Sequence, residues 1–254
     1  MSKKLANDCV AFPGDAVTSF TQALASGQQF LQSSPQSSFQ IIYNSQTSQV
    51  ELQLERVSVR SDFPSLFGPG DVPGYLSEED MQAITELVSM LPQNGLLVEI
   101  GTFLGKSAVE WAKNIQQQSK DYKIICIDSF NSPIEILRDL LQEAEFTIPE
   151  ADSQLTMFKH YTKEFSSVQP LEAFFDKDFE FNQTIDLVFE DSDHSQRALN
   201  YALPFWWQRI RPGGILSGHD YWGREIKTAV DTFAVLNGLT VKTFAGSSIW
   251  YIEK

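Results

Sequence analysis

The feature that most limits the fold of this chain is a short segment in which a strand pattern gives way to a helix pattern through two glycines. An apolar run over 96–100 ends at Gly101, and Gly105 opens an amphipathic pattern over 105–117. In α/β proteins this arrangement forms a crevice for a nucleotide-like ligand at the carboxyl end of a strand. Glycine lets a ligand approach the backbone closely, and the helix start offers unpaired N–H groups.

Strand and helix patterns alternate from Ser77 to the end of the chain, and Ser77 and Asp80 form a capping-box pattern. Alternation of this kind predicts a mostly parallel, doubly wound sheet. The last two strands are separated only by a short turn at Gly246, so they should pair antiparallel. We expect helices over 77–91, 105–117, 133–146, 153–165, 195–211 and 223–237, and seven strands over 96–100, 123–128, 168–173, 185–190, 215–218, 239–244 and 248–252.

The first 75 residues differ in composition from the rest, being rich in Ser, Gln and Pro. Alternation at Phe39–Tyr43 and Val50–Val59 suggests a β-hairpin, and the turn-rich segment Phe67–Gly74 suggests a boundary. We expect an N-terminal extension over 1–75 and a main domain over 76–254. Two interpretations stay open: the extension packs over the site of the main domain, or residues 1–35 form a partly disordered leader.

Composition limits the functional class. A chain of 254 residues can bury one core plus a small appendage. The net charge of −14 argues against a broad basic face for nucleic acid, because phosphate contacts need Lys and Arg. Cys9 and Cys126 imply no disulfide framework, and Cys126 lies in an apolar strand pattern that predicts a buried thiol. With no apolar run long enough for a membrane or a signal peptide, we expect a cytoplasmic enzyme.

The glycine spacing argues against a nicotinamide dinucleotide site, whose usual signature is G-x-G-x-x-G. Phe103 stands where the middle glycine would allow close approach of a pyrophosphate. The run from Glu99 to Ser107 instead resembles the first motif of class I S-adenosylmethionine-dependent methyltransferases, in the form found in catechol-type and macrolide-sugar O-methyltransferases. The resemblance covers about 77–252, including the terminal hairpin, and implies a Rossmann-like methyltransferase domain.

The resemblance implies a set of residues that bind S-adenosylmethionine. Asp128, at the end of the second strand, would grip the ribose hydroxyls, since a carboxylate accepts hydrogen bonds from vicinal hydroxyls. Glu99 would lie near the methionine portion and orient the loop. Asp128 as a loop cap, Phe130 as a core aromatic and Ser107 as a helix first-turn donor remain alternatives. The expected cofactor residues are Glu99, Gly101, Thr102, Gly105, Ser107, Asp128, Ser129 and Phe130.

A second polar group follows the strands over 185–190 and 215–218. Because parallel strands end at one edge of a sheet, a polar group should converge there: Asp191, Asp193, His194, His219 and Asp220. Two carboxylates and an imidazole can hold Mg²⁺ or Mn²⁺. The resembled metal-dependent enzymes, including the macrocin-type and cephalosporin-hydroxylase-like branch, place one ligand after the first of these strands and two after the second. This implies Asp191, His219 and Asp220 as ligands, with His219 where the family often has an acid.

A cation-free alternative uses His194 or His219 as the general base toward a substrate hydroxyl. A third alternative is purely structural, with loop-capping acids and hydrogen-bonded histidines. Strand alternation should turn Glu190 away from the site. Other residues carry weaker expectations: His160 at the surface, Trp206 and Trp207 in the core, and Tyr221 and Trp222 lining an acceptor pocket.

The favoured hypothesis is methyl transfer from S-adenosylmethionine to a hydroxyl oxygen of a small molecule with divalent-cation assistance. Asp191, His194 and His219 are the expected catalytic residues, and neither nucleic acid nor membrane is expected as a partner. One rival is a non-catalytic regulator or subunit that keeps the cofactor fold. Another is a nicotinamide-dependent oxidoreductase. The acceptor and the state of homo-oligomerisation stay open.

Overall fold

The computed structural model describes residues 7–12, 38–44, 49–55 and 67–254, and the chain divides into two compact units, Met1–Asp62 and Phe63–Lys254. In the first unit, β1 (Asn7–Phe12), β2 (Ser38–Asn44) and β3 (Gln49–Glu55) form an antiparallel sheet in the order β1-β3-β2. β2 and β3 pair where a hairpin was expected, whereas β1 was not anticipated. Residues 13–35 of the expected leader and 56–59 of the expected strand lie outside the described residues. Coverage of the site by the extension stays a prediction.

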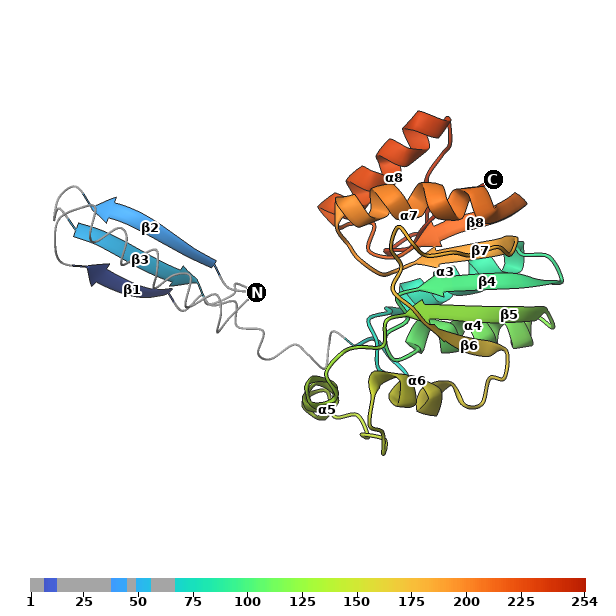
Figure 1. Cartoon of the computed structure of the whole chain (residues 1–254), viewed down its shortest axis with the longest axis horizontal. Helices are drawn as coiled ribbons and strands as arrows, with labels where there is room; N and C mark the ends of the chain where they lie inside the picture. The colour runs from blue at the N-terminus through green and yellow to red at the C-terminus, as the bar shows by residue number, and fades with distance from the viewer. Residues whose placement is uncertain (1–6, 13–37, 45–48, 56–66) are drawn as a thin grey trace. The chain divides into compact units, whose positions relative to one another are not determined.

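The second unit contains a seven-stranded sheet in the order β6-β5-β4-β7-β8-β10-β9, which confirms the predicted fold class. Figure 1 shows the part of the sheet from β6 to β8. The strands from β6 to β8 pair parallel, and β10 pairs antiparallel with both β8 and β9. Its strands are β4 (Asn94–Ile100), β5 (Asp121–Asp128), β6 (Val168–Glu172), β7 (Ile185–Glu190), β8 (Ile210–Gly218), β9 (Lys242–Thr243) and β10 (Trp250–Glu253). Its helices are α3 (Glu78–Met90), α4 (Lys106–Gln117), α5 (Ile134–Glu143), α6 (Gln154–Thr162), α7 (Gln196–Arg209) and α8 (Arg224–Asn237).

Alternation along the central strand divides the apolar core between the two faces of the sheet. Leu97 of β4 packs in a cluster with apolar residues of α3 and α4, including the fully buried Trp111. Val98 of β4 faces the other way, into a cluster with α7 and α8 that includes the fully buried Trp206. Cys126 is a buried free thiol, as expected. Helices cover both faces of the sheet. The side of the sheet where the parallel strands have their carboxyl ends is not covered by these helices.

The segment Pro212–Gly214, expected to be a turn, lies inside β8 instead. The pairing of β7 with β8 shifts register between Ile185 and Leu187, and a bulge of this kind accommodates proline within a sheet. A Cβ atom on Gly214 would lie 2.8 Å from the carbonyl oxygen of Asp186, so glycine permits the close approach. The apolar strand pattern of 215–218 is therefore only the second half of β8.

The expected capping box starts α3. Asp80 N donates to Ser77 Oγ at 3.1 Å, and Ser77 N donates to Asp80 Oδ2 at 3.0 Å. Reciprocal bonds of this kind satisfy N–H groups that a helix start leaves unpaired. Asp80 is buried at 1% exposure, so this capping acid faces the interior. Among the described residues, no helix combines the length and apolar character needed to span a membrane.

Candidate functional site

The carboxyl ends of β4, β5, β7 and β8 border a cavity of about 880 Å³. A smaller recess of about 50 Å³ adjoins it and shares Gly101, Phe103, Asp191 and His219. Thr102 and Ser107 line this recess and do not line the large cavity. A ligand could therefore extend from the large cavity toward the start of α4. The large cavity is lined by Tyr75, Ile100, Gly101, Phe103, Ile127, Asp128, Ser129, Asn131, Ser132, Gln154, Ala173, Phe174, Phe175, Asp191, Ser192, Asp193, His194, His219, Asp220 and Trp222.

The segment Gly101–Gly105, here called the glycine loop, turns sharply between β4 and α4. Gly101 has φ +80°, and a Cβ atom there would lie 2.2 Å from the carbonyl oxygen of Asp191. Only glycine combines this backbone angle with this approach. Gly105 has φ +93° and packs against Phe158 and Thr162 of α6. Gly101 thus brings the end of β7 against the loop, while Gly105 closes the loop onto the fold.

Glu99 holds the glycine loop in place through hydrogen bonds. Its fully buried carboxylate accepts hydrogen bonds from Ser107 Oγ and from Thr102 Oγ1, the latter at 3.2 Å. Burial raises the pKa of Glu99 to about 8, and the charge of Asp191 adds to the rise, although the hydrogen bonds oppose it. The carboxyl lines neither cavity. Glu99 and Ser107 therefore orient the loop through the hydrogen bond between them.

Asp128 ends β5 at the rim of the large cavity and also caps the loops around it. Its Oδ2 accepts from Thr102 N at 3.1 Å and from Phe103 N at 3.0 Å. Its Oδ1 accepts from Phe130 N at 2.9 Å. Capping and cavity lining, which the sequence posed as alternatives, thus coexist at Asp128. Ser129 also lines the cavity, whereas Phe130 is buried and packs edge-to-face on Phe158.

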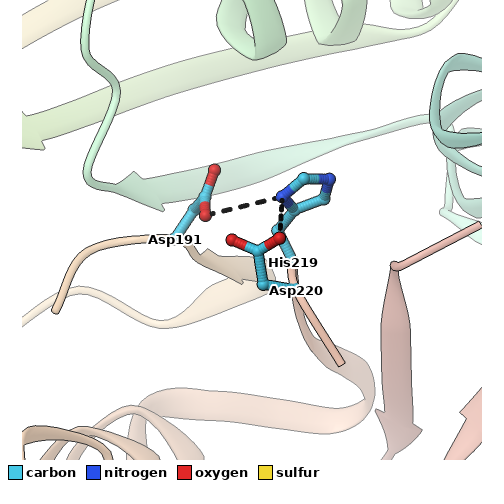
Figure 2. A group of neighbouring side chains, drawn as sticks. All are labelled: Asp191, His219 and Asp220. Atoms are coloured by element: carbon cyan, nitrogen blue, oxygen red, sulfur yellow. Dashed lines mark ion pairs between the residues drawn. The ribbon is translucent and has the colours of Figure 1, made fainter. Parts of the chain in front are cut away.

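Asp191, His219 and Asp220 point toward one another at the ends of β7 and β8, as Figure 2 shows. His219 Nδ1 lies 3.8 Å from Asp191 Oδ1 and 3.4 Å from Asp220 Oδ1. One ligand atom from each of the three residues lies within 4.8 Å of the others. Two carboxylate oxygens and one imidazole nitrogen form a donor set that fits a divalent cation. The expected ligand triad is therefore spatially compact.

The charges of these residues are strongly coupled. Burial alone lowers the pKa of His219, but hydrogen bonds with Asp220 and Asp80 and the charge of Asp191 outweigh it and raise the pKa to about 10. Burial raises the pKa of Asp191, and the neighbouring charge of Asp220 adds to the rise. Three carboxylates surround His219, so positive charge at this point is stabilised.

His194 completes the group that we call the polar edge: Asp191, His194, His219 and Asp220. Its Nε2 lies 3.6 Å from Asp191 Oδ1 and 3.4 Å from Asp220 Oδ2. The side chain is 55% exposed and lines the large cavity, so a ligand can reach it. The Asp191 carboxylate raises the pKa of His194, burial lowers it in part, and the charge of Asp220 adds to the rise.

Asp80 belongs to this site, and the sequence reasoning missed it. Its Oδ2 lies 3.2 Å from His219 Nε2, on the side of the ring opposite Asp191 and Asp220. The capping-box pattern accounts for an acid at this position but says nothing about a second partner. A signal was present, because Asp80 shares the apolar face of α3 with Ile84 and Leu87, at helical spacing.

The remaining expectations have distinct outcomes. Trp222 lines the large cavity, whereas the hydroxyl of Tyr221 points to α8 and hydrogen-bonds Asp231 and Lys227. Glu190 is buried and lines neither cavity, as alternation predicted. Asp193 lines the large cavity and its carboxylate accepts from Ser195 N at 2.8 Å, at the start of α7. Trp206 is fully buried, Trp207 packs on Phe233, and His160 lies on α6 against Tyr161.

Comparison with known proteins relates the central part of the chain to a known family. A family model described as a methyltransferase domain matches residues 98–221, from β4 to just beyond β8. No relative with a curated description matches the sequence. The matched segment contains the glycine loop, Asp128 and the whole polar edge.

Solved structures with the same fold include methyltransferases of several kinds. The O-methyltransferase NovP superposes with a TM-score of 0.50 and 16% identity, covering 70% of this chain and 80% of NovP. A TDP-rhamnose 3′-O-methyltransferase of calicheamicin biosynthesis gives 0.48 and 14%, with 70% and 82% covered. The N-methyltransferase NodS from Bradyrhizobium japonicum, in complex with S-adenosyl-L-homocysteine, gives 0.46 and 15%, with 76% and 96% covered. At 16% identity, the superposition with NovP supports the fold alone.

The second unit of the chain has the Rossmann-like methyltransferase fold, and its residues 98–221 match the methyltransferase domain model. The strand order and the glycine loop agree with this fold. A match to the fold does not name the acceptor atom, so the acceptor has to be argued from the polar edge.

Proposed function

We propose that the chain methylates a hydroxyl oxygen of a small molecule with the help of a divalent cation. The observation that carries this proposal is the convergence of Asp191, His219 and Asp220 beside the large cavity. A methyltransferase whose acceptor is already a good nucleophile has no need of three metal-type ligands there. A hydroxyl is a weak nucleophile, and activation is what such a site contributes.

In this proposal, the chain aligns the acceptor hydroxyl with the methyl group of S-adenosylmethionine and removes the hydroxyl proton. Gly101 and Asp128 border the region where S-adenosylmethionine would bind, and the polar edge faces the same cavity. Asp191, Asp220 and Nδ1 of His219 would hold Mg²⁺ or Mn²⁺. When bound, a cation of this kind lowers the pKa of a coordinated hydroxyl. Proximity and alignment of the oxygen with the sulfonium methyl supply most of the remaining acceleration.

His194 is the group in this site best suited to take the hydroxyl proton. It is exposed to the cavity, and the carboxylates of Asp191 and Asp220 stabilise its protonated form. A histidine near a substrate hydroxyl acts as a general base without any cation. The geometry therefore also supports a second, cation-independent form of the same transfer, in which His194 carries the activation alone.

The walls of the cavity support a small acceptor. Tyr75, Phe174 and Trp222 line it, and Trp222 is 69% exposed. Aromatic side chains bind flat or apolar faces of sugars, phenols and polyketides through contact area. The net charge of −14 disfavours a nucleic-acid acceptor.

The test uses the full chain with S-adenosylmethionine, a library of sugar, phenol and polyketide hydroxyl compounds, and Mg²⁺, Mn²⁺ or a chelator. We expect release of S-adenosylhomocysteine with at least one acceptor, faster with cation than with chelator. Equal rates with chelator would favour the His194 form. The His160→Ala variant, changed outside the cavity, is the matched control and should keep the full rate.

The rival functions give different results in the same assay. A regulator or subunit should bind S-adenosylhomocysteine in calorimetry and transfer no methyl group to any hydroxyl. An oxidoreductase should bind a nicotinamide dinucleotide instead. Either result would overturn the proposed transfer.

A further inference from the structure

His219 is held from behind by a carboxylate that comes from a distant part of the chain. Asp80 of α3 places Oδ2 3.2 Å from His219 Nε2, while Nδ1 of the same ring faces Asp191 and Asp220. Both side chains are buried, at 2% exposure for Asp80 and 5% for His219. The two ring nitrogens therefore have different partners, and water has little access to either residue.

Asp80 is surrounded by hydrogen-bond donors that hold it in its charged form. Its Oδ1 accepts from Ser247 Oγ at 2.7 Å and from Ser248 N at 2.9 Å, and its Oδ2 accepts from Ser77 N at 3.0 Å. Backbone N–H groups can only donate, so the contacts with Ser77 N and Ser248 N make both oxygens of Asp80 acceptors. An ionised carboxylate can only accept hydrogen bonds.

This has a consequence for the His219 ring. A partner that only accepts requires a hydrogen on Nε2. In a neutral imidazole with hydrogen on one nitrogen, the other carries the lone pair. Without a cation, the facing carboxylates favour a second hydrogen on Nδ1. A bound cation would take the place of that hydrogen, and the lone pair would then lie on Nδ1, which points toward Asp191 and Asp220.

We infer that Asp80 is a positioning residue for the cation site: it binds the Nε2 hydrogen of His219 and thereby presents Nδ1 as the third ligand. The inference rests on the proposed cation-dependent function. A carboxylate behind a metal-bound histidine fixes both the ring orientation and the site of its hydrogen.

The contacts of Asp80 extend this role to the C-terminal hairpin. Ser247 and Ser248 lie between β9 and β10, and Ser248 O also accepts from Tyr221 N at 2.9 Å, next to Asp220. The capping box of α3, the hairpin and the end of β8 thus meet at one buried carboxylate. The antiparallel hairpin that closes the sheet therefore supports the orientation of the proposed ligands.

The first test compares Mn²⁺ affinity in Asp80→Asn and Ser247→Ala variants of the full chain. An amide at position 80 places an N–H group against one of the existing donors, so it cannot impose the same hydrogen position on His219. We expect Asp80→Asn to bind Mn²⁺ about 10- to 100-fold more weakly. Ser247→Ala removes one hydrogen bond to Asp80 but leaves those from Ser77 N and Ser248 N and the contact with His219, so Mn²⁺ affinity should fall by no more than about threefold.

Affinity for S-adenosylhomocysteine reports whether each variant is folded, and it should stay near wild type in both. Equal Mn²⁺ affinity in Asp80→Asn and wild type, with methyl transfer intact in wild type, would overturn this inference and leave the proposed function standing. No cation binding by wild type would overturn the inference together with the cation-dependent function.

The second test needs no change at position 80, so it decides the matter even if Asp80→Asn does not fold. The chain has three histidines, which keeps a ¹⁵N ring spectrum simple. His160→Gln and His194→Gln variants assign the signals. In wild type with Mg²⁺ or Zn²⁺, both diamagnetic, we expect His219 to carry hydrogen on Nε2 and none on Nδ1. Hydrogen on Nδ1 in the cation-loaded protein would contradict the positioning role.

Discussion

The glycine loop and the polar edge face the same cavity but are stabilised in opposite ways. The loop is held by hydrogen bonds that pair its polar groups: Asp128 accepts two of its backbone N–H groups, and Glu99 accepts the hydroxyl of Thr102. At the polar edge, carboxylates and imidazoles lie 3.4–3.8 Å apart, and His194 remains exposed.

The difference indicates a division of labour. A region with its polar groups paired internally is preorganised and binds a ligand without rearrangement. A region with two acids beside the cavity favours a positive charge between them, which protonated His219 supplies and which a bound cation would supply in its place. The loop is therefore suited to holding a cofactor, and the polar edge is suited to holding a cation or a proton. Each of the following variants tests one side of this comparison.

The largest effect should come from Gly101→Ala, which acts on the loop. The new Cβ atom would lie 2.2 Å from the carbonyl oxygen of Asp191, at φ +80°. Backbone strain and overpacking together should lower the free energy of unfolding by about 3–5 kcal/mol. Urea unfolding followed by circular dichroism measures this change. A loss below about 1 kcal/mol would mean that the loop relaxes and is not preorganised.

Asp220→Asn should give the next largest effect, on catalysis with little effect on folding. Asp220 has φ +55°, which Asn also tolerates, so the backbone should be preserved. Loss of one charged ligand should lower kcat/KM by about 100-fold or more with cation present, corresponding to roughly 3 kcal/mol. Binding of S-adenosylhomocysteine should change little. Unchanged turnover would remove the cation from the proposed mechanism.

Asp128→Ala should have a smaller effect on function, seen in cofactor binding, and it also removes the cap on the N–H groups of Thr102, Phe103 and Phe130. Loss of charge-assisted hydrogen bonds worth roughly 1.5–3 kcal/mol should weaken S-adenosylhomocysteine binding by about 10- to 100-fold. Mn²⁺ affinity should remain near that of wild type, because Asp128 is not in the ligand group. Calorimetry with each ligand separately tests both statements. Unchanged S-adenosylhomocysteine affinity would contradict the ribose role and leave only loop capping.

Glu99→Gln should produce the smallest effect, visible as a change in pH dependence. The pKa of Glu99 is about 8 in the folded protein, against an ordinary 4.5, so the folded state binds this proton more tightly. Stability from this group is complete below the ordinary pKa and is lost as pH rises through about 8. The neutral Gln side chain should remove this loss.

The measurement is the difference in unfolding free energy between Glu99→Gln and wild type, from about pH 5 to about pH 9. We expect the difference to move in favour of the variant as pH rises. Parallel curves would show that Glu99 is ionised throughout and that its carboxylate braces the loop as an anion.

Much of the methyltransferase unit could be predicted from the sequence because its signals are local. Apolar periodicity located every strand from β4 to β8, and the short turn at Gly246 required the antiparallel end of the sheet. Parallel strands have their carboxyl ends on one side of a sheet, and this predicted that Asp191, His219 and Asp220 lie close together. Apolar periodicity, turn length and strand direction can all be deduced from the sequence, and they decide these features.

Other features depended on contacts that no local pattern encodes. Pro212–Gly214 has turn composition, but pairing with β7 and the close approach of Asp186 make it part of β8. Tyr221 and Trp222 are adjacent, yet only Trp222 faces the cavity, because Asp231 of α8 binds the Tyr221 hydroxyl. Asp231 reaches Tyr221 because of the way α8 packs, and this packing cannot be deduced from the spacing of residues in the sequence.

The sequence by itself determined the class of fold, the glycine loop and the edge of the sheet where the polar residues gather, because periodicity and strand direction act over short distances. Only the tertiary structure decided that Asp80, which belongs to a helix cap, reaches His219 from behind. That contact spans 139 positions of the chain and forms because α3 packs its apolar face under the sheet, carrying the buried acid with it.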